Sequence, residues 1–152
     1  MNSSLIKCFV FFLLLSGFLQ FSNAQNNARI RQNLNDNWSF SFDESKNKIE
    51  RVKIPHTWND KDAFDDIAGY RRGVSWYQRE LKIDEGLKNK RLFLYFEAVN
   101  HTAEVFINEK FIGSHIGGYT AFVFDVTEAF SFDKPNQIKV KVDNTLDKNK
   151  PP

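Results

Sequence analysis

A group of acidic, amide and aromatic side chains lies between two strand-like segments, in the stretch from Pro55 to Tyr77. Its polar candidates for ligand recognition are Asn59, Asp62, Asp65 and Asp66. A connection of this length that is rich in charge and aromatic rings is usually functional or disordered. Trp58, Phe64 and Tyr70 favour order, because disordered segments are poor in aromatic residues. We therefore interpret the stretch as an ordered loop that presents polar groups at the rim of a β-scaffold.

Other readings of these residues stay open. The aspartates are also ordinary turn residues. A calcium loop beginning Asp60-x-Asp62 is excluded, because Phe64 occupies the third ligand position and the required glycine is missing. Arg71 and Arg72 could steer an acidic ligand, but an ion pair with Asp65 or Asp66 is favoured, because an arginine fork matches a carboxylate with two hydrogen bonds.

The remaining aromatic and ionisable residues favour structural roles. Trp58 and Trp76 could stack on a ligand ring, yet such tryptophans more often pack against a core. His56 and His115 have no serine, cysteine or metal-ligand partner in register, so both are interpreted as structural and no metal or cofactor is expected. Glu97 and Glu104 lie on predicted strands without an acidic partner at a useful spacing. They are interpreted as charges on a strand surface, and no catalytic residue is predicted.

Residues 1–24 have the pattern of a secretory signal peptide. Lys7 is their only charge, Cys8 to Phe21 is almost unbroken apolar sequence, and Ser22-Asn23-Ala24 places small residues before a cleavage site after Ala24. The apolar run is short for a membrane span, which needs about 20 residues, and a signal anchor is the alternative. We expect a secreted or periplasmic protein with no membrane association after cleavage.

Residues 25–152 carry 20 basic and 19 acidic side chains, because the first 24 residues contain one lysine and no acid. A net charge of +1 provides no bulk attraction for nucleic acid or an acidic membrane. The only cysteine of the chain is Cys8, so an exported product has no disulfide and depends on its core. A domain of 128 residues can bury roughly two-thirds of its unfolded surface.

Alternating apolar residues predict about eight strands and no helix longer than a turn. Trp38 to Phe42 and Ile138 to Val142 have the period of two that marks a strand with one buried face. Leu92 to Ala98 is apolar on both faces, which predicts a central strand covered on two sides. Asn108-Glu109-Lys110 predicts a hairpin turn. Short strands separated by turn signals indicate an all-β, antiparallel sandwich.

Six segments in this order resemble the N-terminal sugar-binding domain of glycoside hydrolase family 2, the β-galactosidase, β-glucuronidase and β-mannosidase family. They are Leu34 to Phe40, Pro55 to Asn59, Gly69 to Tyr77, Phe96 to Asn108, His115 to Thr127 and Asn136 to Asn144. The resemblance covers nearly all of residues 25–152. Its style is most similar to β-galactosidases of secreting Gram-negative bacteria.

The resemblance implies a jelly-roll β-sandwich of the galactose-binding type, with a carbohydrate as ligand and a catalytic barrel of the same parent chain as partner. The barrel would supply the two glutamates of retaining chemistry, which sit about 5 Å apart, so residues 25–152 alone are expected to be inactive. In the family, a loop of this domain reaches the barrel mouth and contacts the terminal sugar. We expect Asp65 and Asp66 to make these contacts first, and Asn59 and Asp62 second.

The chain ends at Pro151-Pro152, beyond the last predicted strand. The resemblance implies a loop at this point and then a further pair of strands, so we expect the last strands of the sandwich to lie beyond residue 152. A free-standing carbohydrate-binding jelly roll is the alternative.

Overall fold

The structure is a computed structural model that describes residues 29–42, 48–62, 64 and 69–148. The proposed signal peptide, with its cleavage site after Ala24, lies outside these residues. The chain divides into two units, residues 1–33 and 34–152, and every strand belongs to the second. No helix in the described part of the chain is long and apolar enough to cross a membrane.

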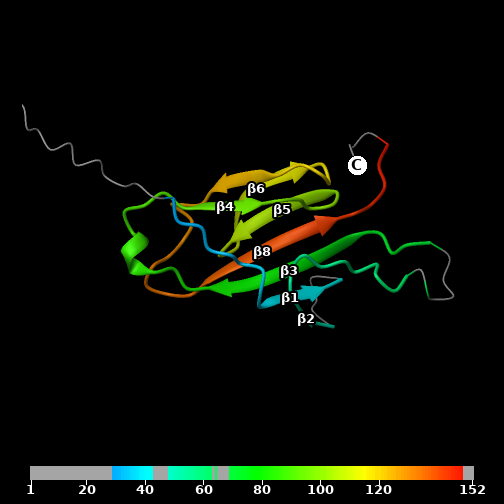
Figure 1. Ribbon diagram of the computed structural model, residues 1–152, viewed down its shortest axis with the longest axis horizontal. Coiled ribbons are helices and arrows are strands. Elements are labelled where there is room, and N and C mark those ends of the chain that lie inside the picture. The colour runs from blue at the N-terminus through cyan, green and yellow to red at the C-terminus, as the bar shows by residue number, and fades with distance from the viewer. Residues whose placement is uncertain (1–28, 43–47, 63, 65–68, 149–152) are drawn as a thin grey trace, which may run out of the picture. The chain divides into compact units, whose positions relative to one another are not determined.

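The described residues of the second unit form eight strands and one short 3-10 helix, η1 (Glu85–Leu87). The strands are β1 (Trp38–Ser41), β2 (Glu50–Val52), β3 (Val74–Leu81), β4 (Phe93–Phe96), β5 (Thr102–Ile107), β6 (Lys110–Ile116), β7 (Phe122–Asp125) and β8 (Asn136–Asp143). Six form one sheet in the order β2-β1-β3-β8-β5-β6, and β4 pairs with β7 in a second sheet (Figure 1). All pairings are antiparallel. The predicted all-β, antiparallel jelly-roll sandwich is confirmed.

Strand β8 lies in the middle of the large sheet, with β3 on one side and β5 on the other. Val140 is opposite Tyr77 of β3 and Val105 of β5, so these side chains share the face that points into the sandwich. The sequence predicted a strand with one buried face, and Lys139 lies on the other face. Lys139 is nevertheless buried, with its ammonium 5.1 Å from the Trp76 ring centroid and 3.2 Å from Glu109 Oε2.

The turn between β5 and β6 is the hairpin predicted from Asn108-Glu109-Lys110. Asn108 and Glu109 have φ angles of 50° and 65°, as a two-residue turn with both central residues in the left-handed region requires. The Asn108 side chain also donates to Asn136 Oδ1 at 2.8 Å and accepts from Gln137 N at 3.0 Å. The turn is therefore fixed to the start of β8.

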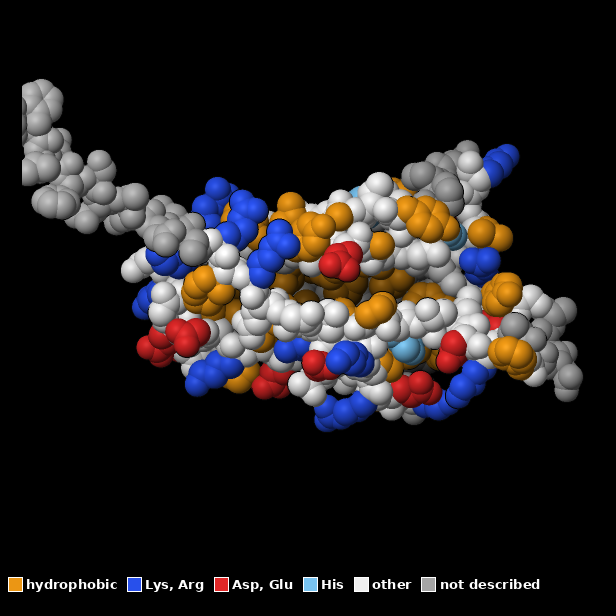
Figure 2. Space-filling view, viewed as in Figure 1, with side chains coloured by type: hydrophobic (Ala, Val, Ile, Leu, Met, Phe, Trp, Pro, Cys, Tyr) orange, Lys and Arg blue, Asp and Glu red, His pale blue; other side chains and the backbone are white. Residues whose placement is uncertain are grey.

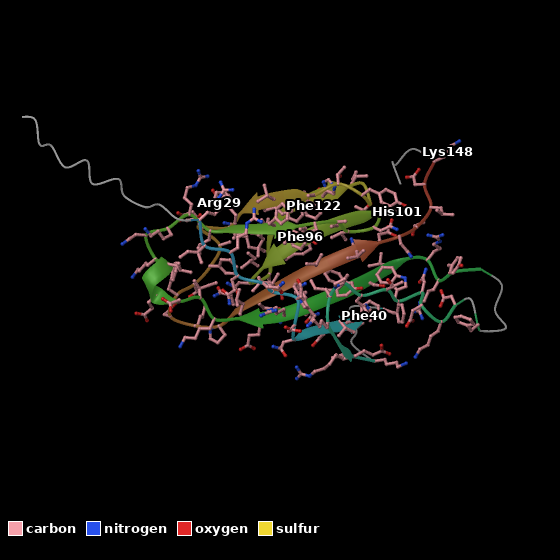
Figure 3. All side chains as sticks on the ribbon, in the orientation of Figure 1. Arg29, Phe40, Phe96, His101, Phe122 and Lys148 are labelled. Carbon is pink, nitrogen blue, oxygen red and sulfur yellow. The ribbon has the colours of Figure 1, made fainter. Side chains whose placement is uncertain are left out.

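The core lies between the large sheet and the β4-β7 pair. Its buried apolar residues are Trp38, Leu94, Ala103, Val105, Ile107, Val126, Ile138, Val140 and Val142. Phe96 and Phe122 pack against them as a stacked pair with centroids 4.8 Å apart (Figure 3). A Cβ atom at Gly113 of β6 would lie 2.5 Å from the Phe124 ring, so the absence of a side chain there lets β6 and β7 approach closely.

The prediction of a central strand for Leu92 to Ala98 is wrong. Strand β4 pairs only with β7 among the described strands, and Phe93 and Tyr95 on its outer face are 50% and 61% exposed. Two apolar faces led to the prediction, but one of them faces outward here. Figure 2 also shows hydrophobic side chains recessed yet uncovered across the middle of the visible face. The small sheet thus covers only part of the core.

Candidate functional site

The acidic loop lies at one end of the large sheet. At this end, Asp143 of β8 is opposite Val74 of β3 on one side and Thr102 of β5 on the other. Thr102 is in turn opposite Ile116 at the end of β6. The segments that follow or precede these residues therefore meet at one end, where Figure 3 labels His101 and Lys148. Exposed large apolar side chains gather there: Phe64, Tyr70, Val74, Ile116, Tyr119 and Leu146. We call this region the loop end of the sheet.

Asn144, directly after β8, joins the exit of the acidic loop to the large sheet. Its buried side chain accepts a hydrogen bond from Gly73 N at 2.8 Å and donates one to Arg71 O at 3.1 Å. Arg72 Nη1 donates to the Asn144 carbonyl at 3.3 Å. The closing residues of the loop are thus fixed by one amide from the far end of the chain.

Arg71 and Asp62 fix the two arms of the loop to each other. Asp62 Oδ2 accepts a hydrogen bond from Arg71 N at 2.7 Å. The Arg71 guanidinium carbon lies 3.3 Å from the centroid of the Phe42 ring, in a cation–π contact. Asp62 was a candidate ligand contact, and in this structure one of its carboxylate oxygens stabilises the loop instead.

An aromatic cluster packs against the first arm of the loop, which includes His56, Trp58 and Asn59. Trp58 stacks on Phe40 with centroids 5.7 Å apart, and Phe40 packs against Tyr77 at 5.0 Å and His56 at 4.8 Å. The core-packing interpretation of Trp58 therefore agrees with the structure. Asn59 follows Trp58 directly, so this cluster sets the position of its amide.

Asn59 is the best-placed polar candidate that the structure describes. Its side chain is partly buried, and its Oδ1 atom is buried without a hydrogen-bond partner in the described part of the protein. A buried acceptor that lacks a partner costs about 1–3 kcal/mol, so a ligand donor at this position would recover that free energy. Asp65 and Asp66, the first candidates, lie outside the described residues, and so does any ion pair that they form with Arg71 or Arg72.

The remaining candidates from the sequence, Trp76, Glu104 and His115, make contacts within the domain. Trp76 is buried and packs on Phe106 with centroids 6.1 Å apart. Glu104 pairs with Lys141 at 2.9 Å on the outer face of the large sheet, and His115 stacks on Phe122 at 4.2 Å. No group of three or more potential metal ligands occurs among the residues described.

Sequence reasoning missed Asn144 as a positioning residue. Replacing it with alanine removes the partners of Gly73 N–H and Arg71 C=O, so we expect a loss of about 2 kcal/mol in the free energy of unfolding. Trypsin should cleave the folded variant faster at Lys61, Arg71 and Arg72. Thr145→Ala is the matched control, because the hydrogen bonds of the exposed Thr145 go to Asp143 alone. Equal cleavage rates for both variants would contradict the role of Asn144.

His56 makes the stability of the loop end depend on pH. Burial lowers the pKa of His56 below its ordinary 6.5, although Asp60 and Glu50 oppose the shift. Burial also raises the pKa of Tyr77, so its hydroxyl stays protonated and can donate to neutral His56 Nδ1 at 2.9 Å. The unfolded chain binds the proton more tightly, so this stabilisation is complete above pH 6.5 and is lost as the pH falls through the folded pKa.

We therefore expect the Tm to fall more between pH 7.5 and pH 5 in the native protein than in His56→Asn. Thermal unfolding followed by circular dichroism at both pH values measures this difference. The same fall in both proteins would show that His56 is not the titrating group.

Comparison with known families identifies the domain. The family model described as "Glycosyl hydrolases family 2, sugar binding domain" matches residues 51–149. The chain belongs to glycosyl hydrolase family 2. This match spans the acidic loop, Asn144 and seven of the eight described strands in whole or in part. The resemblance found in the six sequence segments is thereby confirmed.

Relatives of this family 2 domain carry two different activity names. A β-glucuronidase of Bacteroides fragilis is 44% identical over 112 residues, which cover 73% of this chain and 16% of that protein. A β-galactosidase of Thermoanaerobacter pseudethanolicus is 40% identical over 124 residues, which cover 81% and 16%. The crystal structure of Bacteroides uniformis β-glucuronidase superposes with a TM-score of 0.67 at 40% identity, over 76% of this chain and 14% of that one. The chain thus spans about a sixth of the length of these relatives.

Proposed function

We propose that this chain is the amino-terminal, non-catalytic sugar-binding domain of a longer glycosidase that hydrolyses O-glycosidic bonds by retention. The match of the family model to residues 51–149 carries the proposal. In a retaining enzyme two carboxyl groups about 5 Å apart do the chemistry. Among the described acids of the loop, Asp62 is engaged in holding the loop through its hydrogen bond from Arg71 N. The catalytic pair would come from a barrel of the same protein, which is the proposed partner.

The loop end would complete the substrate pocket of that barrel. Asn59 offers an amide whose buried Oδ1 has no partner within the described residues, and Asp65 and Asp66 would add carboxylates. These groups accept hydrogen bonds in fixed directions, which suits the hydroxyls of a terminal sugar. The rigid frame of Asn144, Arg71 and the Trp58 cluster limits the motion of the loop, and such preorganisation lowers the entropic cost of binding.

We propose β-galactosides as the substrate class, with β-glucuronides as the second candidate. The style of the sequence segments favours the first, and the names of several relatives favour the second. A glucuronide carries a carboxylate, which would need a cation in the pocket. We further propose that residues 1–24 direct export and are cleaved after Ala24, which mass spectrometry of the protein secreted by its own host would test.

The experiment is to express the product of the complete reading frame and assay aryl β-galactoside and aryl β-glucuronide side by side. We expect hydrolysis of one of them, and no hydrolysis of either by residues 25–152 alone. A reading frame that stops at residue 152 with a stable, sugar-binding product would instead favour the free-standing module. Turnover by the purified 25–152 domain itself would overturn the assignment of a non-catalytic role.

A further inference from the structure

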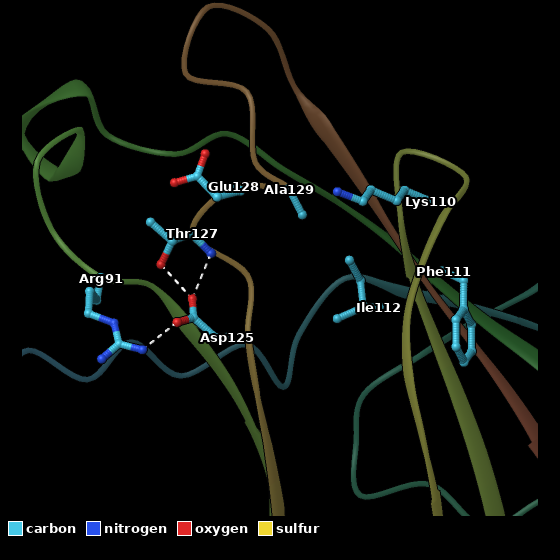
Figure 4. A pocket seen from close by; sticks show the side chains of 8 residues that line it. All are labelled: Arg91, Lys110, Phe111, Ile112, Asp125, Thr127, Glu128 and Ala129. Atoms are coloured by element: carbon cyan, nitrogen blue, oxygen red, sulfur yellow. Dashed lines mark hydrogen bonds and ion pairs between the residues drawn. The ribbon is translucent and has the colours of Figure 1, made fainter.

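A hollow of about 410 Å³ lies at the opposite end of β6 from the loop end. Its walls are formed by Arg91, Lys110, Phe111, Ile112, Asp125, Thr127, Glu128 and Ala129 (Figure 4). Strand β6 runs from Lys110 beside the hollow to Ile116 at the loop end, a distance of roughly 20 Å at about 3.3 Å per residue. A ligand in the hollow would therefore not touch the acidic loop.

One wall of the hollow is a preformed polar network. Arg91 Nη2 donates to Asp125 Oδ2 at 2.6 Å, and Asp125 Oδ1 accepts from the Thr127 hydroxyl at 2.6 Å and from Thr127 N at 3.1 Å (Figure 4). The hydrogen bonds from Thr127 and then Arg91 lower the pKa of Asp125 to about 2, so the carboxylate is ionised at any physiological pH. Its position is fixed before any ligand arrives.

The hollow also holds two charged side chains that have no assigned task. The side chains of Lys110 and Glu128 make no hydrogen bond or ion pair with the part of the chain that the structure describes. Together with Arg91 and Asp125, they give the walls two positive and two negative charges. These groups include both donors and acceptors, which can bond to the hydroxyl groups of a neutral ligand.

The facing wall is apolar. It is formed by Ile112 of β6 and by Ala129, which also pack against the core. Phe111 is the neighbour of Ile112 on the strand, so its side chain points to the opposite face, where its ring centroid lies 5.5 Å from that of Phe106. Beside the hollow, the Arg91 guanidinium carbon lies 4.9 Å from the ring centroid of Phe93. The apolar C–H face of a sugar ring can be buried against apolar side chains such as Ile112 and Ala129.

We propose that this hollow binds a neutral hexose unit of an oligosaccharide, at a site separate from the catalytic pocket. The hydroxyls would bond to Lys110, Glu128 and the Arg91–Asp125 pair, and the C–H face would lie on Ile112 and Ala129. The volume is within the range of about 300–1,000 Å³ that is typical of ligand sites. The site would hold a glycan against the domain independently of which bond the parent protein cleaves.

The test compares two double variants of the complete protein. In Lys110→Ala/Glu128→Ala both changed side chains are exposed and unpaired, so the fold should be retained. Glu80→Ala/Lys82→Ala is the matched control, because it removes one charge of each sign from exposed positions outside the hollow. Methyl β-cellobioside is titrated by saturation-transfer NMR in the presence of a saturating glyconolactone, which occupies any catalytic pocket.

We expect the hollow variant to bind the glycoside about tenfold more weakly than the native protein, and the control to bind unchanged. Equal affinity in all three proteins, or no saturation transfer to the glycoside in the native protein, would overturn the proposal. Hydrolysis of aryl glycosides is recorded on the same samples. If the proposed function is wrong, the hydrolysis assay shows no turnover. The NMR titration still measures whether the hollow binds the glycoside.

Discussion

In the complete protein, Asp65→Ala and Asp66→Ala are expected to lower kcat/KM by one to three decades. Each decade corresponds to about 1.4 kcal/mol of lost transition-state stabilisation. The reason is that a carboxylate fixed at the pocket rim accepts hydrogen bonds from sugar hydroxyls, and its removal leaves those hydroxyls without a partner. Steady-state kinetics with aryl glycosides, in parallel with thermal unfolding, measures the effect apart from any loss of fold.

The matched control is Asp60→Ala, which removes an exposed aspartate of the same loop. It should leave kcat/KM within about twofold of the native value, because nothing assigns Asp60 to the ligand. If Asp65→Ala and Asp66→Ala also keep native kinetics, the acidic loop has only a structural task. In that case Asn59, with its unpartnered Oδ1, would be the remaining polar candidate of the loop.

Residues 25–152 alone are expected to be aggregation-prone or partly molten, and extension into the following sequence is expected to restore a cooperative fold. In the described chain β4 and β7 pair only with each other, so the outer edges of this small sheet expose backbone hydrogen-bonding groups. Phe93, Tyr95 and Val123 on its outer face are at least half exposed. Each large apolar side chain left in water forfeits about 1.5–3 kcal/mol, against a total stability of about 5–15 kcal/mol.

Urea unfolding and analytical ultracentrifugation of residues 25–152 and of a series of longer chains measure this effect. The shortest chain should give a broad transition and concentration-dependent association, and a chain that adds strands to the β4-β7 sheet should give a sharp transition as a monomer. A matched chain extended by an equal length of glycine and serine controls for length. A sharp, reversible transition of monomeric 25–152 would contradict this prediction and support the free-standing module.

Local patterns predicted those parts of the fold that local chemistry decides. The Asn108-Glu109 turn was predictable because few residues adopt positive φ without strain. The alternation in Ile138 to Val142 identified a strand because one face of β8 meets the core. The position of β4 was not predictable, because two apolar faces do not tell whether a strand lies in the middle of a sheet or in a two-stranded one. Pairing decides that, and pairing is a long-range property.

The sequence predicted where the site lies in the chain, but it did not predict the contacts that hold the loop in place. The composition of Pro55 to Tyr77 pointed to a functional loop, and its match to the family model bears out that the stretch belongs to the domain. The residues that hold it were invisible in the sequence, because Asn144 acts on Gly73 across 71 positions. The Arg71 guanidinium lies on Phe42, a contact that the sequence did not indicate, and its expected ion pair with Asp65 or Asp66 lies outside the described residues. Only the folded chain brings these partners together.

The most direct test of the central claim is a crystal structure of the complete protein with a sugar held in its catalytic pocket. We predict that the loop end of the sheet faces the barrel mouth and that Asn59, Asp65 or Asp66 lies about 3 Å from a hydroxyl of the terminal sugar. A structure in which this end faces solvent, with no polar atom of residues 55–77 within hydrogen-bond distance of the sugar, would contradict it.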